Sequence, residues 1–177
     1  MNDFFDEIKD FLEEEGRDFR YKIGDKAINL HSDLDFTPII SYEYLNIDAL
    51  ADFSFVQPEF QSFTSEQYPD KSDYHIYFET IKYVCSKKLN DLLNEDYTKH
   101  FKTINNPKKE LVEIVSKILN IKNNTKMQLP QLGEFALYTN KNGNKAPRIF
   151  FFIGNLGIIY VLFYDPFHKI FPLKNNI

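Results

Sequence analysis

The sequence predicts an α+β fold, an antiparallel sheet with a central C-terminal β-hairpin packed by two main helices. Apolar residues recur at steps of three and four over residues 73–94 and 107–121, which is typical of amphipathic helices. Two nearly continuous apolar runs, 147–153 and 157–164, flank a short Gly-Asn-Leu turn, a pattern typical of buried strands joined as a hairpin. Acids opposite an apolar stripe over residues 2–15 predict an additional acidic helix at the N-terminus.

Local signals support the two main helices. Asp73 is placed to cap the first helix, and Pro107 suits the first turn of the second. Cys85 falls on the apolar stripe of the first helix, so we expect a small buried side chain there. It is the only cysteine of the chain, which excludes an internal disulfide.

The remaining strands are shorter. Residues 134–139 predict one more strand of the sheet, and residues 168–173 predict a short tail or edge strand. Residues 19–64 are interrupted by prolines and predict three or four short strands, including a hairpin of 20–23 with 27–30. We therefore expect an acidic layer or appendage over residues 1–70 and an α+β core over residues 71–177.

The charge of the chain is divided between its two parts. Residues 1–98 hold 9 Lys and Arg against 22 Asp and Glu, a formal −13, and residues 99–177 hold 12 against 4, a formal +8. The net charge of −5 hides both. This division predicts either complementarity within the molecule or a basic part that binds an anion such as nucleic acid.

Several function classes lack their sequence signatures. The chain has no GxxxxGK[ST], GxGxxG, HExxH or GxSxG pattern, so we expect no cofactor. With one cysteine and four histidines at no ligand spacing, we expect no metal site. The N-terminus is acidic and the longest apolar stretch is short and interrupted, which predicts a cytoplasmic protein without a membrane span.

Three residues carry the chemistry that metal-free RNA cleavage needs. His100 and His168 could transfer protons near neutral pH, and Arg148 could hold a phosphate with its forked guanidinium. The sequence leaves a structural alternative open, in which His168 bonds Asp165 to lock a turn and Arg148 is an ordinary charge at a strand end.

The basic part also predicts a nucleic-acid surface. We expect Lys102, Lys126, Lys145 and Lys169 to bind phosphates and neighbouring aromatic rings to stack on bases. Other lysines of this part are Lys108, Lys109, Lys117, Lys122 and Lys141. The alternative is a solvated lysine face that only offsets the acidic part.

The segments 129–135, 148–152 and 158–163 together resemble the C-terminal half of RelE/HigB-type toxins. They run Leu-Pro, Glu, then Arg-Ile and an apolar strand, a turn and a second apolar strand. The resemblance implies a small antiparallel sheet with helices on one side, and cleavage of mRNA, usually on the ribosome. The chain departs from that family in its tail after the last strand and in its long acidic front.

A second resemblance rests on residues 151–155 and 160–172. Their Asp-Pro-Phe-His-Lys-Ile-Phe-Pro ending resembles that of an uncharacterised family of small proteins from bacterial and mobile-element genomes. The two resemblances together imply a RelE-like sheet with an acidic N-terminal layer, in a prophage or toxin–antitoxin setting.

Two main functions follow from these observations. The first is an RNA-binding protein, with metal-independent RelE-like ribonuclease activity as its catalytic form. The alternative is a non-catalytic interaction protein of a mobile element, an inhibitor or accessory factor, whose acidic face binds a basic protein partner. A structural oligomer subunit that pairs through Phe167, Ile170 and Phe171 is a third reading, and the sequence does not fix the oligomeric state.

Overall fold

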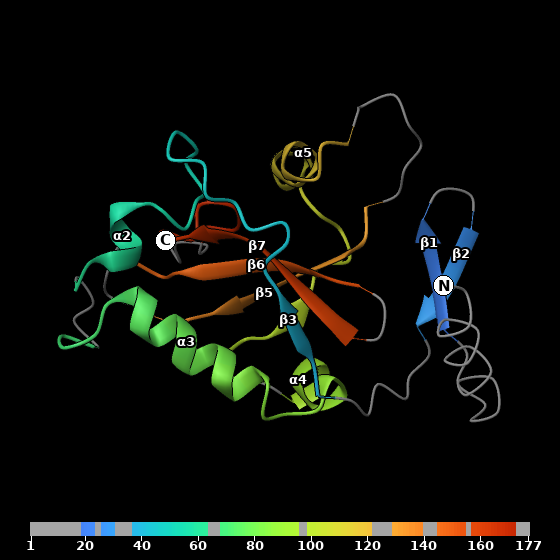
Figure 1. The fold of residues 1–177 in the computed structure, drawn as a ribbon, viewed down its shortest axis with the longest axis horizontal. Coiled ribbons are helices and arrows are strands. Elements are labelled where there is room, and N and C mark those ends of the chain that lie inside the picture. The colour runs from blue at the N-terminus through green and yellow to red at the C-terminus, as the bar shows by residue number, and fades with distance from the viewer. Residues whose placement is uncertain are drawn as a thin grey trace, which may run out of the picture.

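The computed structural model has the α+β architecture that the sequence predicts (Figure 1). It describes residues 19–23, 26–30, 37–63, 68–95, 99–121, 129–139, 145–154 and 157–172. The acidic helix expected over residues 2–15 lies outside the described residues. No helix in these ranges is long and apolar enough to cross a membrane.

Five strands form one mixed sheet. Their order is β3-β7-β6-β5-β4. The bounds are Ile39–Ser41 for β3, Lys102–Thr103 for β4, Gln131–Ala136 for β5, Arg148–Ile153 for β6 and Ile158–Asp165 for β7. Neighbours pair antiparallel except β3, which runs parallel to β7. The two long apolar strands therefore lie inside the sheet and the shortest strands form its edges, which limits pairing with other chains.

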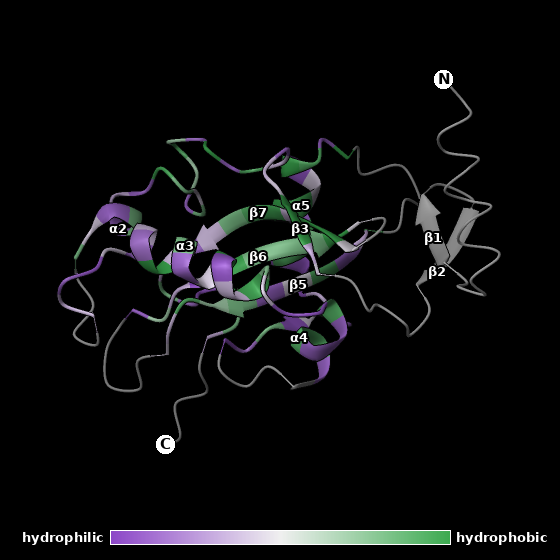
Figure 2. Cartoon of the chain, turned by 60° about the horizontal axis from the view of Figure 1, so that its bottom comes forward, coloured by the Kyte–Doolittle hydropathy of each residue, from purple (hydrophilic) through white to green (hydrophobic). Residues whose placement is uncertain are grey.

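The helices are short and lie outside the sheet. Their bounds are Pro58–Gln61 for α2, Asp73–Val84 for α3, Leu89–Glu95 for α4 and Lys109–Ile118 for α5. In Figure 2 the strands of the sheet centre are hydrophobic, whereas the outer sides of α3 and α4 are hydrophilic. A separate two-stranded sheet pairs β1, Phe19–Ile23, with β2, Lys26–Leu30, in the antiparallel arrangement that the sequence predicts.

The single helix expected over residues 73–94 is broken into α3 and α4. After Cys85 the chain tightens, because Ser86 N–H donates to Tyr83 O at 3.0 Å and Lys87 N–H donates to Val84 O at 3.2 Å. These are bonds to the third residue back, which end an α-helix. The apolar spacing continues across the break, and Leu89 at the start of α4 is again fully buried.

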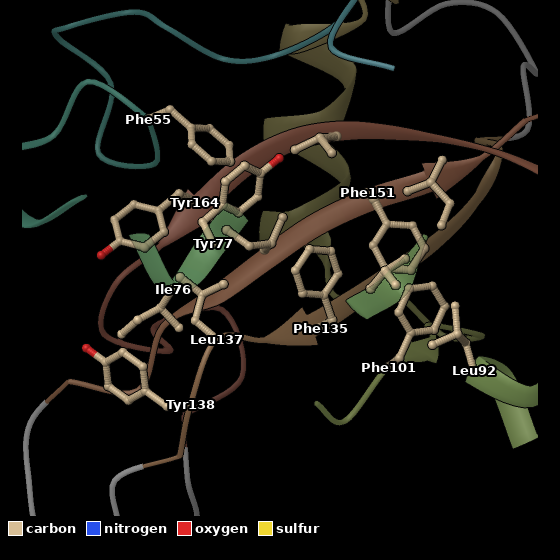
Figure 3. Close-up of a cluster of buried hydrophobic side chains, with 14 of the residues drawn as sticks. Phe55, Ile76, Tyr77, Leu92, Phe101, Phe135, Leu137, Tyr138, Phe151 and Tyr164 are labelled. Carbon is tan, nitrogen blue, oxygen red and sulfur yellow. The ribbon is translucent and has the colours of Figure 1, made fainter. Parts of the chain in front are cut away.

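Both faces of the sheet are covered. On one face, which we call the α3 face, Ile76 and Tyr77 pack with Phe135, Phe151 and Tyr164 (Figure 3). On the other, the α5 face, Leu111 and Val115 of α5 pack with Leu132, Phe150 and Phe163. Side chains alternate between faces along each strand, which explains why β6 is buried over its whole length. The RelE/HigB resemblance implied helices on one side only, and the described sheet differs from it in this respect.

Residues 37–63 contribute to the sheet itself and to the cores on both of its faces. β3 extends it beside β7, and Phe53 joins the core of the α5 face while Phe55 and Phe60 join that of the α3 face. Residues 168–172 form no strand, so of the tail or edge strand expected there the described residues show a tail that contains a bend. Hydrogen bonds that Asp165 accepts from the following backbone explain this path and are described below.

Candidate functional site

Three charged side chains meet at one end of the sheet, on the α5 face. Arg148 lies directly opposite Asp165 across β6 and β7, and Glu134 of β5 lies opposite Phe150 of β6. Arg148 has the strand parity of Phe150, which packs on the α5 face. The same alternation places Glu134 and Asp165 there, so the sheet register alone gathers two acids around one arginine.

The two carboxylates of this cluster have different partners. Glu134 is 1% exposed, and its Oε1 lies 2.9 Å from Lys102 Nζ, whereas its Oε2 has no hydrogen-bond partner among the described residues. Asp165 is fully buried and accepts backbone hydrogen bonds from Phe167 at 3.2 Å and Ile170 at 3.0 Å. Asp165 thus fixes the path of the chain after β7 as a turn.

Arg148 holds the backbone at this end of the sheet. It is buried, and its Nη1 lies 3.1–3.2 Å from the carbonyl oxygens of Tyr138, Ala146 and Pro147. Burial lowers the pKa of Arg148 from its ordinary value, and the carboxylates of Glu134 and Asp165 act in the opposite direction. The guanidinium therefore joins the end of β5 to the start of β6 and does not point into solvent.

His168 lies in the turn that Asp165 fixes. Its backbone has a φ of 54°, and its side chain is buried, with no hydrogen-bond partner for either ring nitrogen among the described residues. Burial, together with the nearby positive charges of Arg148, Lys102 and Lys108, lowers the pKa of His168 from 6.5 to about 4. The ring is therefore neutral at physiological pH. The bond to Asp165 that the sequence left open is not formed, because neither ring nitrogen of His168 has a hydrogen-bond partner in the part of the chain that the structure describes.

Exposed lysines surround this turn. Lys102 keeps 58% of its side chain exposed while it pairs with Glu134. The exposed Lys108 donates from Nζ to Ile170 O at 3.0 Å, and Lys169 Nζ lies 5.5 Å from the ring centroid of the partly exposed Phe167. We call Lys102, Lys108, Phe167 and Lys169 the lysine surface. It covers the buried cluster with positive charge and one accessible ring.

The other predicted site residues lie apart from this cluster. His100 is exposed, with a φ of 50°, and none of the described contacts joins it to Arg148 or His168. Lys126 lies outside the described residues. Lys145 is 7% exposed, and its Nζ lies 3.1 Å from Asp73 Oδ2 and donates to Glu59 O at 2.9 Å. An ammonium held this way is not presented to a phosphate.

Asp73 is the centre of a second buried cluster, on the α3 face. It accepts hydrogen bonds from the hydroxyls of Tyr138, at 2.9 Å, and Tyr164. Both tyrosines are drawn in Figure 3. Burial and the adjacent Asp73 raise the pKa of Tyr164, so its hydroxyl stays protonated and donates. Asp73 was expected as a helix cap, but Ser72 occupies that position and Asp73 ties α3 to the sheet instead.

Sequence reasoning gave Asp165 and Asp73 only local roles, in a turn and in a helix cap, and gave Glu134 none. Glu134 stands in an otherwise apolar strand and Asp165 ends another, and an acid in such a strand is a signal of a buried ion pair. Chemically, the α5-face cluster offers a neutral imidazole and a guanidinium bonded to backbone carbonyl oxygens, beneath an exposed cationic surface. Within the described ranges, no three His, Cys, Asp or Glu side chains are grouped to hold a metal ion.

The comparisons with known proteins give a family. A search of the curated proteins found no match, and neither did a search of the solved structures. The family model described as "Uncharacterised protein UU032" matches residues 53–176, more than two thirds of the chain. That match includes the sheet strands β4 to β7, both buried clusters and the lysine surface. The chain therefore belongs to the family of Uncharacterised protein UU032.

Proposed function

We propose that this protein binds RNA through the lysine surface around the turn of residues 165–171. The observation that carries the proposal is the grouping of Lys102, Lys108 and Lys169 around one turn that also presents Phe167. Lysine ammonium groups at a surface neutralise phosphates, and an accessible ring can stack on an unpaired base. These two contacts together favour a single-stranded ligand over a duplex.

The buried cluster supports this role by shaping the surface. Asp165 fixes the turn through two backbone N–H groups, and Arg148 anchors the strand beside it. Because the buried cluster holds the turn, the backbone that positions the surface lysines is already ordered before RNA binds. Preorganisation lowers the entropy that binding costs.

The burial of His168 and Arg148 favours binding without cleavage. A general base must come within hydrogen-bond reach of the proton it removes, and His168 is 8% exposed. The finer expectation, a RelE-like ribonuclease with His168, Arg148 and His100 as catalytic residues, requires the turn to open and His100 to approach. That finer expectation also includes a cytoplasmic location, a toxin–antitoxin or prophage setting and a likeness to RelE. These remain predictions.

The direct test is RNA affinity as a function of salt. The full chain is titrated with a fluorescent oligouridine, and the same series is measured for Lys102→Gln/Lys108→Gln/Lys169→Gln. Each lost phosphate contact lowers the slope of log K against log salt by roughly 0.7, so the triple variant should lose about 2 from the slope. A matched variant, Lys82→Gln/Lys87→Gln/Lys109→Gln, removes three exposed lysines elsewhere. If the two variants lose equal affinity, or the wild type binds no RNA at low salt, the proposal fails.

The alternative function is an acidic face that binds a basic protein, and acids of the N-terminal segment such as Asp3, Glu7 and Glu14 are the residues whose charge reversal would test it. These residues lie outside the described part of the chain. A different acidic surface is described, and it carries the inference that follows.

A further inference from the structure

Exposed apolar side chains gather in one acidic segment of the chain. Of the large hydrophobic residues that the described ranges expose, six of nine lie in residues 37–63: Ile39, Tyr42, Ile47, Leu50, Val56 and Phe63. This segment has no Lys or Arg, and its four charged residues are all acids. Its exposed surface is therefore apolar and negative, in contrast to the lysine surface.

The most exposed of these side chains stands at a loop tip. Leu50 is 96% exposed and Ile47 is 64% exposed, and between and beside them lie the exposed acids Asp48 and Asp52. In Figure 1 the loop is the cyan segment between β3 and α2 that projects from the body of the protein. We call residues 47–52 the Leu50 loop.

Asn46 closes the base of the Leu50 loop. Its N–H donates to Leu162 O of β7 at 2.6 Å, and its side-chain amide donates to Phe53 O. On the far side of the loop, Phe55 N–H donates back to Asn46 O at 3.1 Å. The ends of the loop are thus fixed to the sheet, where Phe53 is buried.

The tip of the loop is ordered by its own residues. Asp48 Oδ1 accepts the N–H of Leu50 at 2.9 Å, and Asn46 Oδ1 accepts the N–H of Asp48 at 3.1 Å. The carbonyl of Ala51 accepts the side-chain amide of Gln57. These hydrogen bonds hold the backbone of the loop, so they fix the point from which the exposed Leu50 side chain projects.

We propose that the Leu50 loop is a docking site for a basic protein partner, which receives Leu50 in an apolar pocket rimmed by Lys or Arg. Charge complementarity selects this occupant, because Asp48 and Asp52 flank the apolar tip and residues 37–63 hold no positive charge. An apolar anchor within a charged rim is the arrangement of interface hot spots. This surface is separate in sequence from the lysine surface and does not rest on RNA binding.

The test uses two synthetic peptides of one amphipathic pattern, one built of Lys and Leu and its twin of Glu and Leu. The full chain is titrated into each fluorescently labelled peptide, and the anisotropy is measured. We expect binding of the Lys peptide only. Leu50→Ala removes most of the apolar side chain that the peptide would bury in the complex, and it should weaken binding about tenfold. Asp48→Asn/Asp52→Asn, which keeps the Oδ1 acceptor for Leu50 N–H, should weaken it and reduce its salt dependence.

Phe78→Ala is the matched control, since Phe78 is an exposed apolar residue on α3, 46% exposed, and it should leave binding unchanged. Thermal unfolding of each variant shows that the fold is kept. The proposal is overturned if Leu50→Ala binds like the wild type, if Phe78→Ala loses as much, or if the Glu twin binds equally. Light scattering that shows a dimer of the wild type and a monomer of Leu50→Ala would assign the loop to a second copy and also overturn it.

Discussion

Lys102 and Glu134 form an ion pair at 2.9 Å directly across the paired strands β4 and β5, with one partner in solvent and the other in the core. The Glu134 side chain is 1% exposed and that of Lys102 is 58% exposed. The pair therefore links the buried cluster, which contains Glu134, to the lysine surface, which contains Lys102. Its ammonium has two roles, to neutralise a buried acid and to contribute to the proposed RNA contact.

The first prediction concerns this pair. Lys102→Met leaves the Glu134 carboxylate buried without its partner, and we expect a loss of about 1–3 kcal/mol in the free energy of unfolding. Urea denaturation measures it. Lys102→Met/Glu134→Leu removes both charges and should recover most of that loss. A double variant that is less stable than Lys102→Met would mean that Glu134 is stabilised by other groups.

The second prediction is a pH dependence from His168. Its pKa is about 4 in the folded protein and near 6.5 when unfolded. Between these values the unfolded chain binds a proton that the folded chain does not, so this contribution to stability is complete above pH 6.5 and falls as the pH is lowered to 4. The loss is roughly 3 kcal/mol, read from urea unfolding across this range.

Two asparagine variants separate His168 from other acid effects. Asn accepts the positive φ of position 168. In His168→Asn, the part of the pH dependence of unfolding free energy that comes from the uptake of one proton should be absent. His100→Asn is the matched control, because His100 also has a positive φ but is exposed. Equal pH profiles for the wild type and His168→Asn would show that the ring is not buried in solution.

The third prediction concerns the α3-face cluster. Asp73→Asn removes the carboxylate that pairs with the buried Lys145, and we expect a loss of about 3 kcal/mol or more. Asp73→Asn/Lys145→Met should be more stable than Asp73→Asn alone. Lys145→Met, if folded, should bind RNA as the wild type does, because its ammonium faces Asp73. A loss of RNA affinity equal to that of Lys102→Met would contradict this assignment.

The fourth prediction tests the close approach of β5 to its two neighbours, β4 and β6. A Cβ at Gly133 would lie 2.4 Å from the ring of Phe151 and 2.8 Å from the carbonyl oxygen of Lys102. Gly133→Ala should therefore destabilise the protein by roughly 1–3 kcal/mol, since neither group can move without disturbing the sheet. Thermal unfolding measures the effect. Gly133→Ala/Phe151→Leu, with a smaller side chain at 151, should recover part of it, and an unchanged melting temperature in Gly133→Ala would argue against this strand pairing.

The fold class was predictable because its main signals are local. The apolar runs of β6 and β7 and the spacing of α5 report burial directly. The break after α3 was missed because the spacing continues through it. The parallel pairing of Ile39 with Ile158 joins β3 to the free edge of β7, a strand far away in the sequence. No local sequence pattern encodes such a pairing.

The candidate site was predictable only in part. The sequence named Arg148 and His168, and the structure brings both into one cluster. Their burial was missed because it depends on the turn that Asp165 fixes through Phe167 and Ile170 N–H groups. The bonds within this turn are local, but its burial against the end of the sheet is set by tertiary packing, so a strand-end arginine and a loop histidine read as exposed in sequence.

The central claim, that RNA contacts the turn of residues 165–171, is tested most directly by mapping the contact. The isotope-labelled full chain is titrated with oligouridine, and amide shifts are followed by NMR. The account predicts shifts concentrated at Lys102, Lys108 and residues 166–170, and none at the Leu50 loop. Shifts concentrated on α3 or at residues 37–63, with the 165–171 turn unchanged, would contradict it.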